Sequence, residues 1–442
     1  MYGFIIALSF GFVNGYIKIN GKYFQSFFLV DNPAQIWYTY PQGEISMYNE
    51  RMYQLGSKRS TIREIFEYAK KRGEEIGAEN VFDFSIGNPS VPAPKEVGEA
   101  IARITTELDP VKLHEYTSAQ GDKAVREQIA ANYTRRFGVA LSRDDLYMTC
   151  GAAASLTITF KTLACDGDEF IVFAPYFPEY AVFVANAGAK LVVLPSKDDM
   201  QPDFDALERA LNPRVKGLLI NSPNNPSGAV YGVETMKKLA EILTKKSAEF
   251  GAPIYLISDE PYRELVYDKQ TVVPSPMAYY DNSIVCYSYS KSLSMPGERI
   301  GYVAVNPKAQ DSRAVYAAVC GAGRSLGFVC APALFQRVAA ACDGLTADLS
   351  VYKRNRDLLY NGLRDYGFTC VYPDGAFYLF VKAAEADGAA FCERAKKYEL
   401  LLVNGADFGA PGWVRIAYCV QTERIERALP LFKKLAQEYG LC

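Results

Sequence analysis

The sequence predicts an α/β fold, in which a large domain has a mostly parallel sheet covered by helices on both faces and a smaller α+β domain follows. From about residue 122, short apolar runs alternate with longer stretches of helical periodicity, an alternation that favours parallel strands joined by helical crossovers. After about residue 340 the pattern changes to long helices separated by isolated strands. The 442 residues suffice for two or three domains, and 49% hydrophobic with 22% charged residues predicts a soluble globular protein.

The elements follow from the spacing of the apolar residues. In the large domain, strands are expected at 146–149, 170–173, 191–194, 217–220, 254–257, 283–287 and 300–305, and helices at 123–137, 152–163 and 233–250. In the smaller domain, helices are expected at 347–363, 389–398 and 423–439, and strands at 368–372, 376–381 and 414–419. An amphipathic helix begins near Ile62, and Gly73 is its expected stop.

The domain limits follow from changes of composition. We expect residues 47–90 and 341–442 to form the small domain and residues 91–340 the large one. Residues 1–46 are rich in aromatic residues, glycine and asparagine and have no regular period, so we predict an extension outside the fold, largely disordered or loosely attached. Packing of this segment on the body is an alternative. Membrane anchoring is another, although the apolar run at 3–13 is shorter than the ~18–20 residues that a membrane helix needs.

Charge and cysteine usage exclude several classes of function. A formal net charge of −2 gives no electrostatic reason to expect nucleic acid or an anionic membrane as a partner. The ten cysteines form no C-x-x-C pair, and His114 is the single histidine, so we expect no metal site. Free thiols without a disulfide framework predict a cytoplasmic protein.

Lys291 carries the most chemical information. It lies in the segment Ser288-Tyr289-Ser290-Lys291, directly after an expected strand, and Arg299 follows eight positions later. A lysine amine can condense with an aldehyde cofactor, and serine hydroxyls and arginine guanidinium groups are good phosphate ligands. Aldehyde and phosphate together indicate pyridoxal 5'-phosphate (PLP). A surface lysine beside a loop that binds no phosphate is the plain alternative.

Two upstream segments supply partners for such a cofactor. Asp259 follows an apolar strand, where a carboxylate can keep a pyridine nitrogen protonated, and Tyr262 can donate a hydrogen bond to the ring oxygen. Asn225 lies in an Asn-Pro turn that projects an amide after another strand. Ligands of parallel sheets lie beyond the carboxyl ends of the strands, where Gly151, Asn225, Asp259 and Lys291 all fall.

These segments resemble the class I/II aminotransferases, the aspartate aminotransferase-like group of fold-type I PLP enzymes. The motifs N-P-S-G, S-D-E-x-Y, S-x-S-K with an arginine eight positions later, and V-R-I occur in the family's order. The resemblance runs from about Asp83 to about Gln421. It implies a homodimer that uses an amino acid and a 2-oxo acid as substrates.

The resemblance also implies roles for residues that bind the cofactor. Five residues form its phosphate cup, Phe177 stacks on its ring, and Tyr116, in a Y-x-x-x-x-G segment, reaches the cofactor phosphate of the neighbouring subunit. The phosphate cup comprises Gly151, Ala152, Ala153, Ser288 and Arg299.

Substrate residues are implied in the same way. Arg415 lies inside an apolar strand, where a charge needs a partner, and in the family this arginine binds the substrate α-carboxylate. Asn225 and Gly87 also contact the substrate. In members of the family that bind a distal carboxylate with a lysine, that lysine stands at the position of Ala153, so the resemblance leaves Arg324 as a candidate substitute for acidic substrates. Arg324 lies in a glycine-rich segment that does not match the dinucleotide-binding fingerprint.

The predicted activity is PLP-dependent transamination with ping-pong kinetics, in which Lys291 is the general base and acid. The donor stays open; aspartate with 2-oxoglutarate is one pair. A PLP-dependent lyase, such as a C–S β-lyase, or a decarboxylase uses the same residues. A non-enzymatic binding protein on this fold is disfavoured by the intact lysine, aspartate and arginine.

Overall fold

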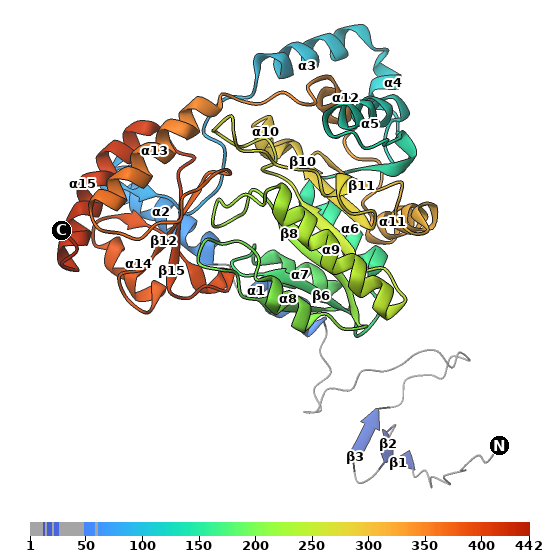
Figure 1. Cartoon of the computed structure of the whole chain (residues 1–442), viewed down its shortest axis with the longest axis horizontal. Helices are drawn as coiled ribbons and strands as arrows, with labels where there is room; N and C mark the ends of the chain where they lie inside the picture. Colours follow the sequence, from blue (N-terminus) through green and yellow to red (C-terminus); the bar gives the residue numbers. More distant parts are fainter. Residues whose placement is uncertain (1–11, 14–15, 20–21, 26–47, 58–60) are drawn as a thin grey trace. The chain divides into compact units, whose positions relative to one another are not determined.

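The computed structural model describes residues 12–13, 16–19, 22–25, 48–57 and 61–442. The chain divides into two compact units, residues 1–59 and 60–442 (Figure 1). In the first unit, three short strands that the sequence did not predict pair in an antiparallel sheet, and the rest of the predicted extension at 1–46 lies outside the described residues. The elements of this unit are β1 (Phe12–Val13), β2 (Tyr16–Ile19), β3 (Lys22–Gln25) and α1 (Glu50–Ser57).

A seven-stranded sheet of order β5-β11-β10-β9-β8-β6-β7 forms the centre of the second unit. All neighbouring pairs are parallel except β10–β11 and β11–β5, so the prediction of a mostly parallel sheet is confirmed. All seven strands lie at or within two residues of their expected positions. They are β5 (Leu146–Thr149), β6 (Glu169–Phe173), β7 (Lys190–Leu194), β8 (Val215–Asn221), β9 (Tyr255–Asp259), β10 (Ser283–Ser288) and β11 (Gly301–Val305).

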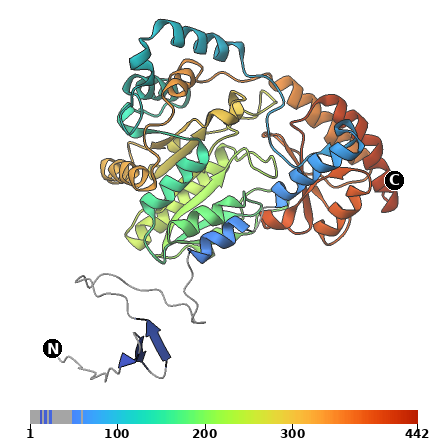
Figure 2. The same ribbon diagram turned by 180° about the vertical axis from the view of Figure 1, so that it is seen from behind.

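Helices cover both faces of this sheet. Along β6, Phe170 and Val172 join the core beneath α6, α7 and α11, while Ile171 and Phe173 join the core beneath α8 and α9, because successive side chains of a strand point to opposite faces. Figures 1 and 2 show α9 and α6 on opposite sides of the sheet. The helices are α3 (Lys95–Glu107), α4 (Pro110–His114), α5 (Lys123–Phe137), α6 (Ala152–Leu163), α7 (Glu179–Asn186), α8 (Phe204–Ala210), α9 (Val233–Phe250), α10 (Tyr289–Ser292), α11 (Ser312–Leu326) and α12 (Ala333–Ala341).

In the second unit, two smaller sheets lie outside the central one. The sheet of order β12-β15-β14 comes from the C-terminal part alone, and the sheet β13-β4 pairs a C-terminal strand with residues 82–83. One apolar cluster joins residues 82–91 with residues 347–436, and Tyr262 and Leu265 also belong to it. The division into a large and a small domain stays a prediction; the pairing of β4 with β13 is consistent with it. The elements are α2 (Thr61–Ile76), β4 (Phe82–Asp83), α13 (Leu349–Asp365), β12 (Tyr378–Lys382), α14 (Gly388–Lys396), β13 (Leu400–Leu401), β14 (Val403–Asn404), β15 (Trp413–Ala417) and α15 (Thr422–Glu438).

Two expectations about elements are wrong. The expected strand at 368–372 does not form, because only scattered backbone bonds join it to β12: the Val371 N–H donates to the Phe380 carbonyl (2.9 Å) and the Lys382 N–H to the Thr369 carbonyl (2.9 Å). The helix α2 does not stop at Gly73 but continues to Ile76.

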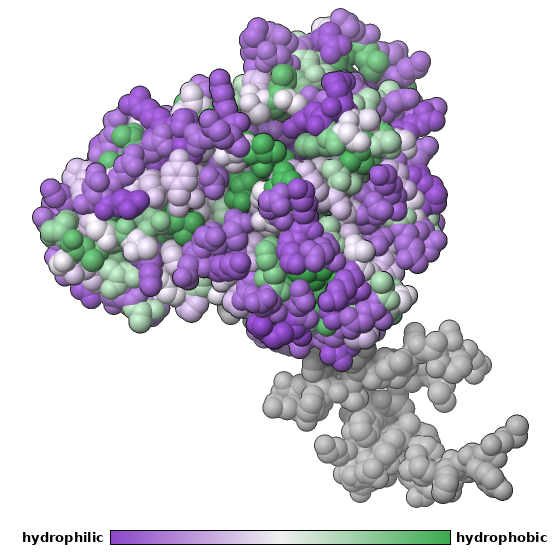
Figure 3. Space-filling model, viewed as in Figure 1, coloured by the Kyte–Doolittle hydropathy of each residue, from purple (hydrophilic) through white to green (hydrophobic). Residues whose placement is uncertain are grey.

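Hydrophilic residues cover most of the face drawn in Figure 3, and hydrophobic residues gather near its middle, around the position of α10 in Figure 1. Among the residues that the structure describes, no helix combines the length and the apolar character needed to cross a membrane.

Candidate active site

The candidate site lies at the carboxyl ends of neighbouring strands. The last residues of β8 and β9 pair, Asn221 with Asp259, and Asp259 also pairs with Cys286 of β10. The Asn221 side chain donates to the Asp259 carbonyl (2.9 Å) and accepts from the Asn225 N–H (2.8 Å). Three of the predicted segments are therefore adjacent, as expected for a ligand site beyond the strand ends.

Lys291 occupies α10, the single helical turn that follows β10. Its Nζ donates to the Gly87 carbonyl (2.6 Å) and lies 5.4 Å from the centre of the Phe377 ring. Burial of the amine lowers the pKa of Lys291 to about 8, because a charged ammonium is poorly solvated there. The charges of Arg299 and Arg415 lower it further. A lysine whose neutral form is accessible near neutral pH can act as a nucleophile and a base.

Asp259 is 5% exposed. Its Oδ2 accepts a hydrogen bond from the Tyr180 hydroxyl (2.5 Å), while its Oδ1 is buried without a partner. Burial raises the pKa of Asp259 to about 7, the Tyr180 hydrogen bond opposes the rise, and the charge of Glu260 adds to it. The carboxylate therefore needs a cationic or N–H donor at Oδ1 to be stable as an ion.

A cradle forms where β5 ends and α6 begins. Gly151 has φ of 89° and caps α6 without a side-chain bond, which leaves the first amides of the helix available. A Cβ at this position would lie 2.9 Å from the Arg299 Nη2, so the guanidinium lies directly against the glycine. The Arg299 Nη1 donates to the Ser290 Oγ (3.3 Å), and the Ser288 Oγ donates to the same oxygen (2.8 Å). Amides, hydroxyls and a guanidinium together suit a phosphate.

Arg415, on β15, is 2% exposed. Its Nη1 donates to the Asn225 Oδ1 (3.0 Å), its Nη2 donates to the Ser85 carbonyl, and its Nε has no partner. The guanidinium also stacks on the Tyr378 ring, 4.6 Å from the ring centre. No carboxylate of the described chain neutralises this buried cation, which is the expected state of a residue that binds an anionic ligand.

Tyr378 is a site residue that the sequence did not reveal. Its hydroxyl and that of Tyr262 lie 2.8 Å apart, and a Cβ at Gly87 would collide with it. Burial, with Tyr378 beside it, raises the pKa of Tyr262 well above its ordinary value, so Tyr262 keeps its proton and can donate it in a hydrogen bond. Tyr180 was missed too: it stands three residues after Phe177, and no feature of the sequence links it to Asp259.

Phe177 lies close to the carboxylate end of the site. Its ring packs edge-to-face on Tyr180, with ring centres 5.5 Å apart, and Tyr180 in turn bonds Asp259. The aromatic side chain that the sequence selected for stacking is therefore connected through Tyr180 to the predicted partner of the cofactor nitrogen.

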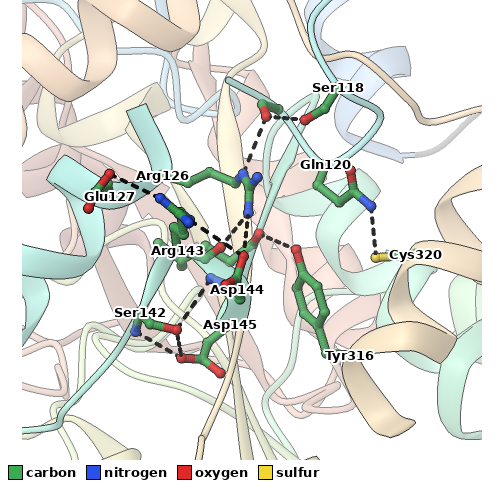
Figure 4. Close-up of polar contacts among 12 residues, drawn as sticks. Ser118, Gln120, Arg126, Glu127, Ser142, Arg143, Asp144, Asp145, Tyr316 and Cys320 are labelled. Carbon is green, nitrogen blue, oxygen red and sulfur yellow. Dashed lines mark hydrogen bonds and ion pairs between the residues drawn. The ribbon is translucent and has the colours of Figure 1, made fainter. Parts of the chain in front are cut away.

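Tyr116 is 93% exposed, in the loop between α4 and α5. The buried Arg126 fixes the end of this loop: its Nε donates to the Gly121 carbonyl (3.3 Å), which also accepts from the Ser118 Oγ (2.5 Å). Figure 4 shows Arg126 between the loop that carries Ser118 and the segment that carries Asp144. The loop is thus held in place while Tyr116 points away from its own chain's core.

Arg324 is not joined to the group. It lies exposed in the last turn of α11, and no hydrogen bond or ion pair connects its side chain to the other predicted site residues in the described part of the chain. Ala152 and Ala153 begin α6 beside Gly151, as the predicted phosphate cup requires.

The residues fit PLP. The unpaired Asp259 Oδ1 matches a protonated ring nitrogen, and the uncapped amides of α6 with Arg299 match a phosphate. Lys291, with its lowered pKa, matches an aldehyde. The unpaired Nε of Arg415 leaves capacity for a substrate carboxylate.

Comparison with known proteins gives consistent relatives. Residues 79–430 match the family described as "Aminotransferase class I and II". A probable aspartate aminotransferase of Methanocaldococcus jannaschii is 32% identical over 86% of this chain and 97% of its own. The aspartate aminotransferase of Thermotoga maritima is 33% identical over 79% of this chain and 90% of its own.

Solved structures agree. An aminotransferase from Eubacterium rectale has 57% identity and a TM-score of 0.88, with 89% of this chain and all of that chain covered. The aspartate aminotransferase of Thermus thermophilus with maleate has 27% identity and a TM-score of 0.77, with 88% of this chain and all of that chain covered. The chain belongs to the class I and II aminotransferases.

Proposed function

We propose that this aminotransferase holds PLP between Lys291 and Asp259 and moves the amino group of an L-amino acid to a 2-oxo acid. The observation that supports this best is the buried, unpaired Oδ1 of Asp259 at the strand end beside α10. A buried carboxylate that has a raised pKa and no donor at Oδ1 is unfavourable as an ion in the free protein, and a protonated ring nitrogen would supply that donor.

The remaining contacts of PLP are assigned by chemistry. Gly151, Ala152, Ala153, Ser288 and Arg299 would hold its phosphate, since they bring amide, hydroxyl and guanidinium donors together at the start of α6.

The ring would be held on two sides. Phe177 would stack on it, and Tyr262 would donate to its oxygen because its pKa keeps it protonated. Asn225 contributes an amide whose Oδ1 already accepts from Arg415. Tyr116 would reach the phosphate of a neighbouring subunit, which makes the active unit a homodimer; its exposure supports this role.

When bound, PLP would supply the aldehyde that takes up the amino group and the ring that withdraws electrons from the substrate α-carbon. Arg415 would bind the α-carboxylate, and Gly87, whose missing Cβ leaves room for the Tyr378 hydroxyl, would lie against the substrate. Lys291 Nζ would then take the α-proton and return it, which its pKa of about 8 suits. Asp259 would hold the ring proton throughout.

The donor is proposed by analogy with relatives named aspartate aminotransferases. The pair aspartate and 2-oxoglutarate is the first choice, with Arg324 as the contact for the distal carboxylate. Ala153 offers no side chain for that purpose. We place the protein in the cytoplasm, because its ten cysteines include no C-x-x-C pair and those described are free thiols.

The test has two steps. Borohydride reduction of the purified protein followed by peptide mapping should place a pyridoxyl group on Lys291 and none in Lys291→Ala; a pyridoxyl group elsewhere would refute the assignment. A panel of amino acids with 2-oxoglutarate then identifies the donor. Release of pyruvate or carbon dioxide without any oxo-acid acceptor would indicate a lyase or decarboxylase instead.

A further inference from the structure

A buried ion-pair cluster lies behind the candidate site and takes no part in the proposed chemistry. Its centre is Arg263, 4% exposed, in the turn after β9. Its guanidinium donates in three directions: Nη1 to Glu260 Oε2 (2.9 Å), Nε to Glu264 Oε1 (3.1 Å) and Nη2 to the Tyr302 hydroxyl (3.1 Å). It also stacks on the Tyr287 ring, 4.1 Å from the ring centre. Every N–H-bearing nitrogen of the guanidinium therefore has a partner.

The charges of this cluster balance. Glu264 accepts from Arg263 and also from Arg136 Nη1 (3.1 Å), so two carboxylates face two guanidinium groups. Burial alone would raise the pKa of Glu264, but the two arginines and Tyr287 hold it below its ordinary value. A buried, fully paired cluster has one favoured geometry, because displacing any member leaves a charge without a partner.

One branch of the cluster reaches α10, the short helical turn that contains Lys291. The Tyr287 hydroxyl donates to Glu264 Oε2 (2.7 Å) and lies 3.1 Å from the Oγ of Ser292, the residue after Lys291. The turn α10 has only four residues, and so short a helix does not hold its geometry by itself. The Ser288 Oγ caps it at one end by accepting from the Ser290 N–H (3.2 Å), and Tyr287 holds Ser292 at the other.

The other branch reaches the turn that follows Asp259 at the end of β9. Glu260 directly follows Asp259, its side chain is bound by Arg263, and its N–H donates to the Cys286 carbonyl of β10 (2.9 Å). Glu260 follows Asp259 and Ser292 follows Lys291 in the chain. A continuous set of hydrogen bonds through Arg263, Glu264 and Tyr287 therefore links these two neighbours.

We propose that Arg263 and Tyr287 are positioning residues for PLP, which fix the turn of Asp259 through Glu260 and the turn of Lys291 through Ser292. This rests on the proposed function, in which those two turns hold the cofactor from opposite sides. The cluster itself touches neither cofactor nor substrate, and its effect is the fixed separation of the two turns.

The test uses the holoenzyme and its Tyr287→Phe and Ser292→Ala variants. Two signals are measured besides stability: the visible circular dichroism per bound PLP, which reports a fixed cofactor orientation, and the rate of PLP loss on dilution. Each variant should lower the dichroism and raise the rate of loss about tenfold, equivalent to ~1.4 kcal/mol. The double variant should show no more than the effect of Tyr287→Phe, because Ser292→Ala removes only the contact with Tyr287, which Tyr287→Phe removes as well.

Tyr280→Phe is the matched control. This substitution also removes a buried tyrosine hydroxyl. In the wild-type protein that hydroxyl donates to the carbonyl of Ile254 (2.7 Å), just before the start of β9 and so at the end of the strand away from Asp259. It should lower the melting temperature and leave both cofactor signals at wild-type values. Arg263→Lys, which keeps one charge but not three donors in a plane, should act like Tyr287→Phe; if it does not fold, Tyr287→Phe decides.

Two outcomes overturn the inference. Wild-type dichroism and wild-type PLP loss in Tyr287→Phe, whatever its melting temperature, would show that the cluster is structural only. Equal changes in Tyr280→Phe would show the same. A wild-type protein without any visible signal from PLP would instead refute the proposed function, and the inference with it.

Discussion

Replacing Asp259 by asparagine should remove a pH-dependent loss of stability from the cofactor-free protein. Burial, with Glu260 nearby, raises the pKa of Asp259 from 3.8 to about 7 in the folded protein, against the opposing Tyr180 bond. Between these values the folded state binds the proton and the unfolded chain does not. Stability therefore falls as the pH rises from about 4, and the loss is complete above about 7.

The magnitude follows from the two pKa values. Between about pH 5 and about pH 8, ionisation of Asp259 lowers the free energy of unfolding by roughly 3 kcal/mol. This value takes into account the fraction of the carboxyl group that is ionised in the folded and in the unfolded state. Asp259→Asn keeps an oxygen for the Tyr180 hydroxyl and does not titrate, so its stability should lack this loss. Tyr180→Phe removes the hydrogen bond that stabilises the ionised carboxylate and should therefore enlarge the loss of stability.

The assay is urea unfolding of the cofactor-free proteins at the two pH values, with the wild-type difference compared to that of each variant. Other titrating groups are shared and cancel in this comparison. Adding PLP should restore the stability that the wild-type protein loses at the higher pH, because the protonated ring nitrogen then pairs with the Asp259 carboxylate. Equal pH dependence in wild type and Asp259→Asn would refute the reasoning.

Further predictions concern single residues of the site and the chain start. Arg415→Ala should raise KM for every amino-acid donor by ~10–100-fold, since a charge-assisted carboxylate contact of ~1.5–3 kcal/mol is lost; steady-state kinetics over a donor panel checks this. Arg324→Ala should weaken only dicarboxylic donors in the same panel, and an equal loss for all donors would dismiss the role. Mixing Tyr116→Phe with Lys291→Ala subunits should give activity different from the average of the parents if sites are shared, whereas full activity of a strict monomer in ultracentrifugation would refute sharing. A chain that starts at Met47 should keep its melting temperature and turnover, because every predicted site residue follows it.

Local signals predicted the elements that surround the site. The bounds of α5 agree with the prediction because the Asp122 side chain caps it, accepting from two amides of its first turn, and Gly138, with φ of 71°, ends it. Asp259 and Lys291 could be proposed from the sequence because each lies at or just after the end of a buried strand, and strand ends in parallel sheets gather at one edge.

Contacts between distant segments were not predictable. Tyr180 and Asp259 are 79 positions apart, and Tyr262 and Tyr378 are 116 apart. Nothing in the local sequence of a tyrosine states which distant side chain its hydroxyl meets, since that depends on how helices and sheets pack. The same holds for the direction of β11: its apolar run predicts a strand but not that it runs antiparallel to both neighbours.

That antiparallel strand has a consequence for how the protein is made. In the central sheet β5 pairs with β11 alone, so the apolar segment ending at Thr149 has no sheet partner until residue 305 has been synthesised. While the ribosome produces the intervening chain, β5 is an open edge of the kind that favours aggregation. Gly151 follows Thr149 and Arg299 precedes Gly301, so both lie at the same end of this late pairing, and a nascent chain therefore acquires its anion cradle only when β11 docks. Chains interrupted before that point should bind chaperones rather than PLP.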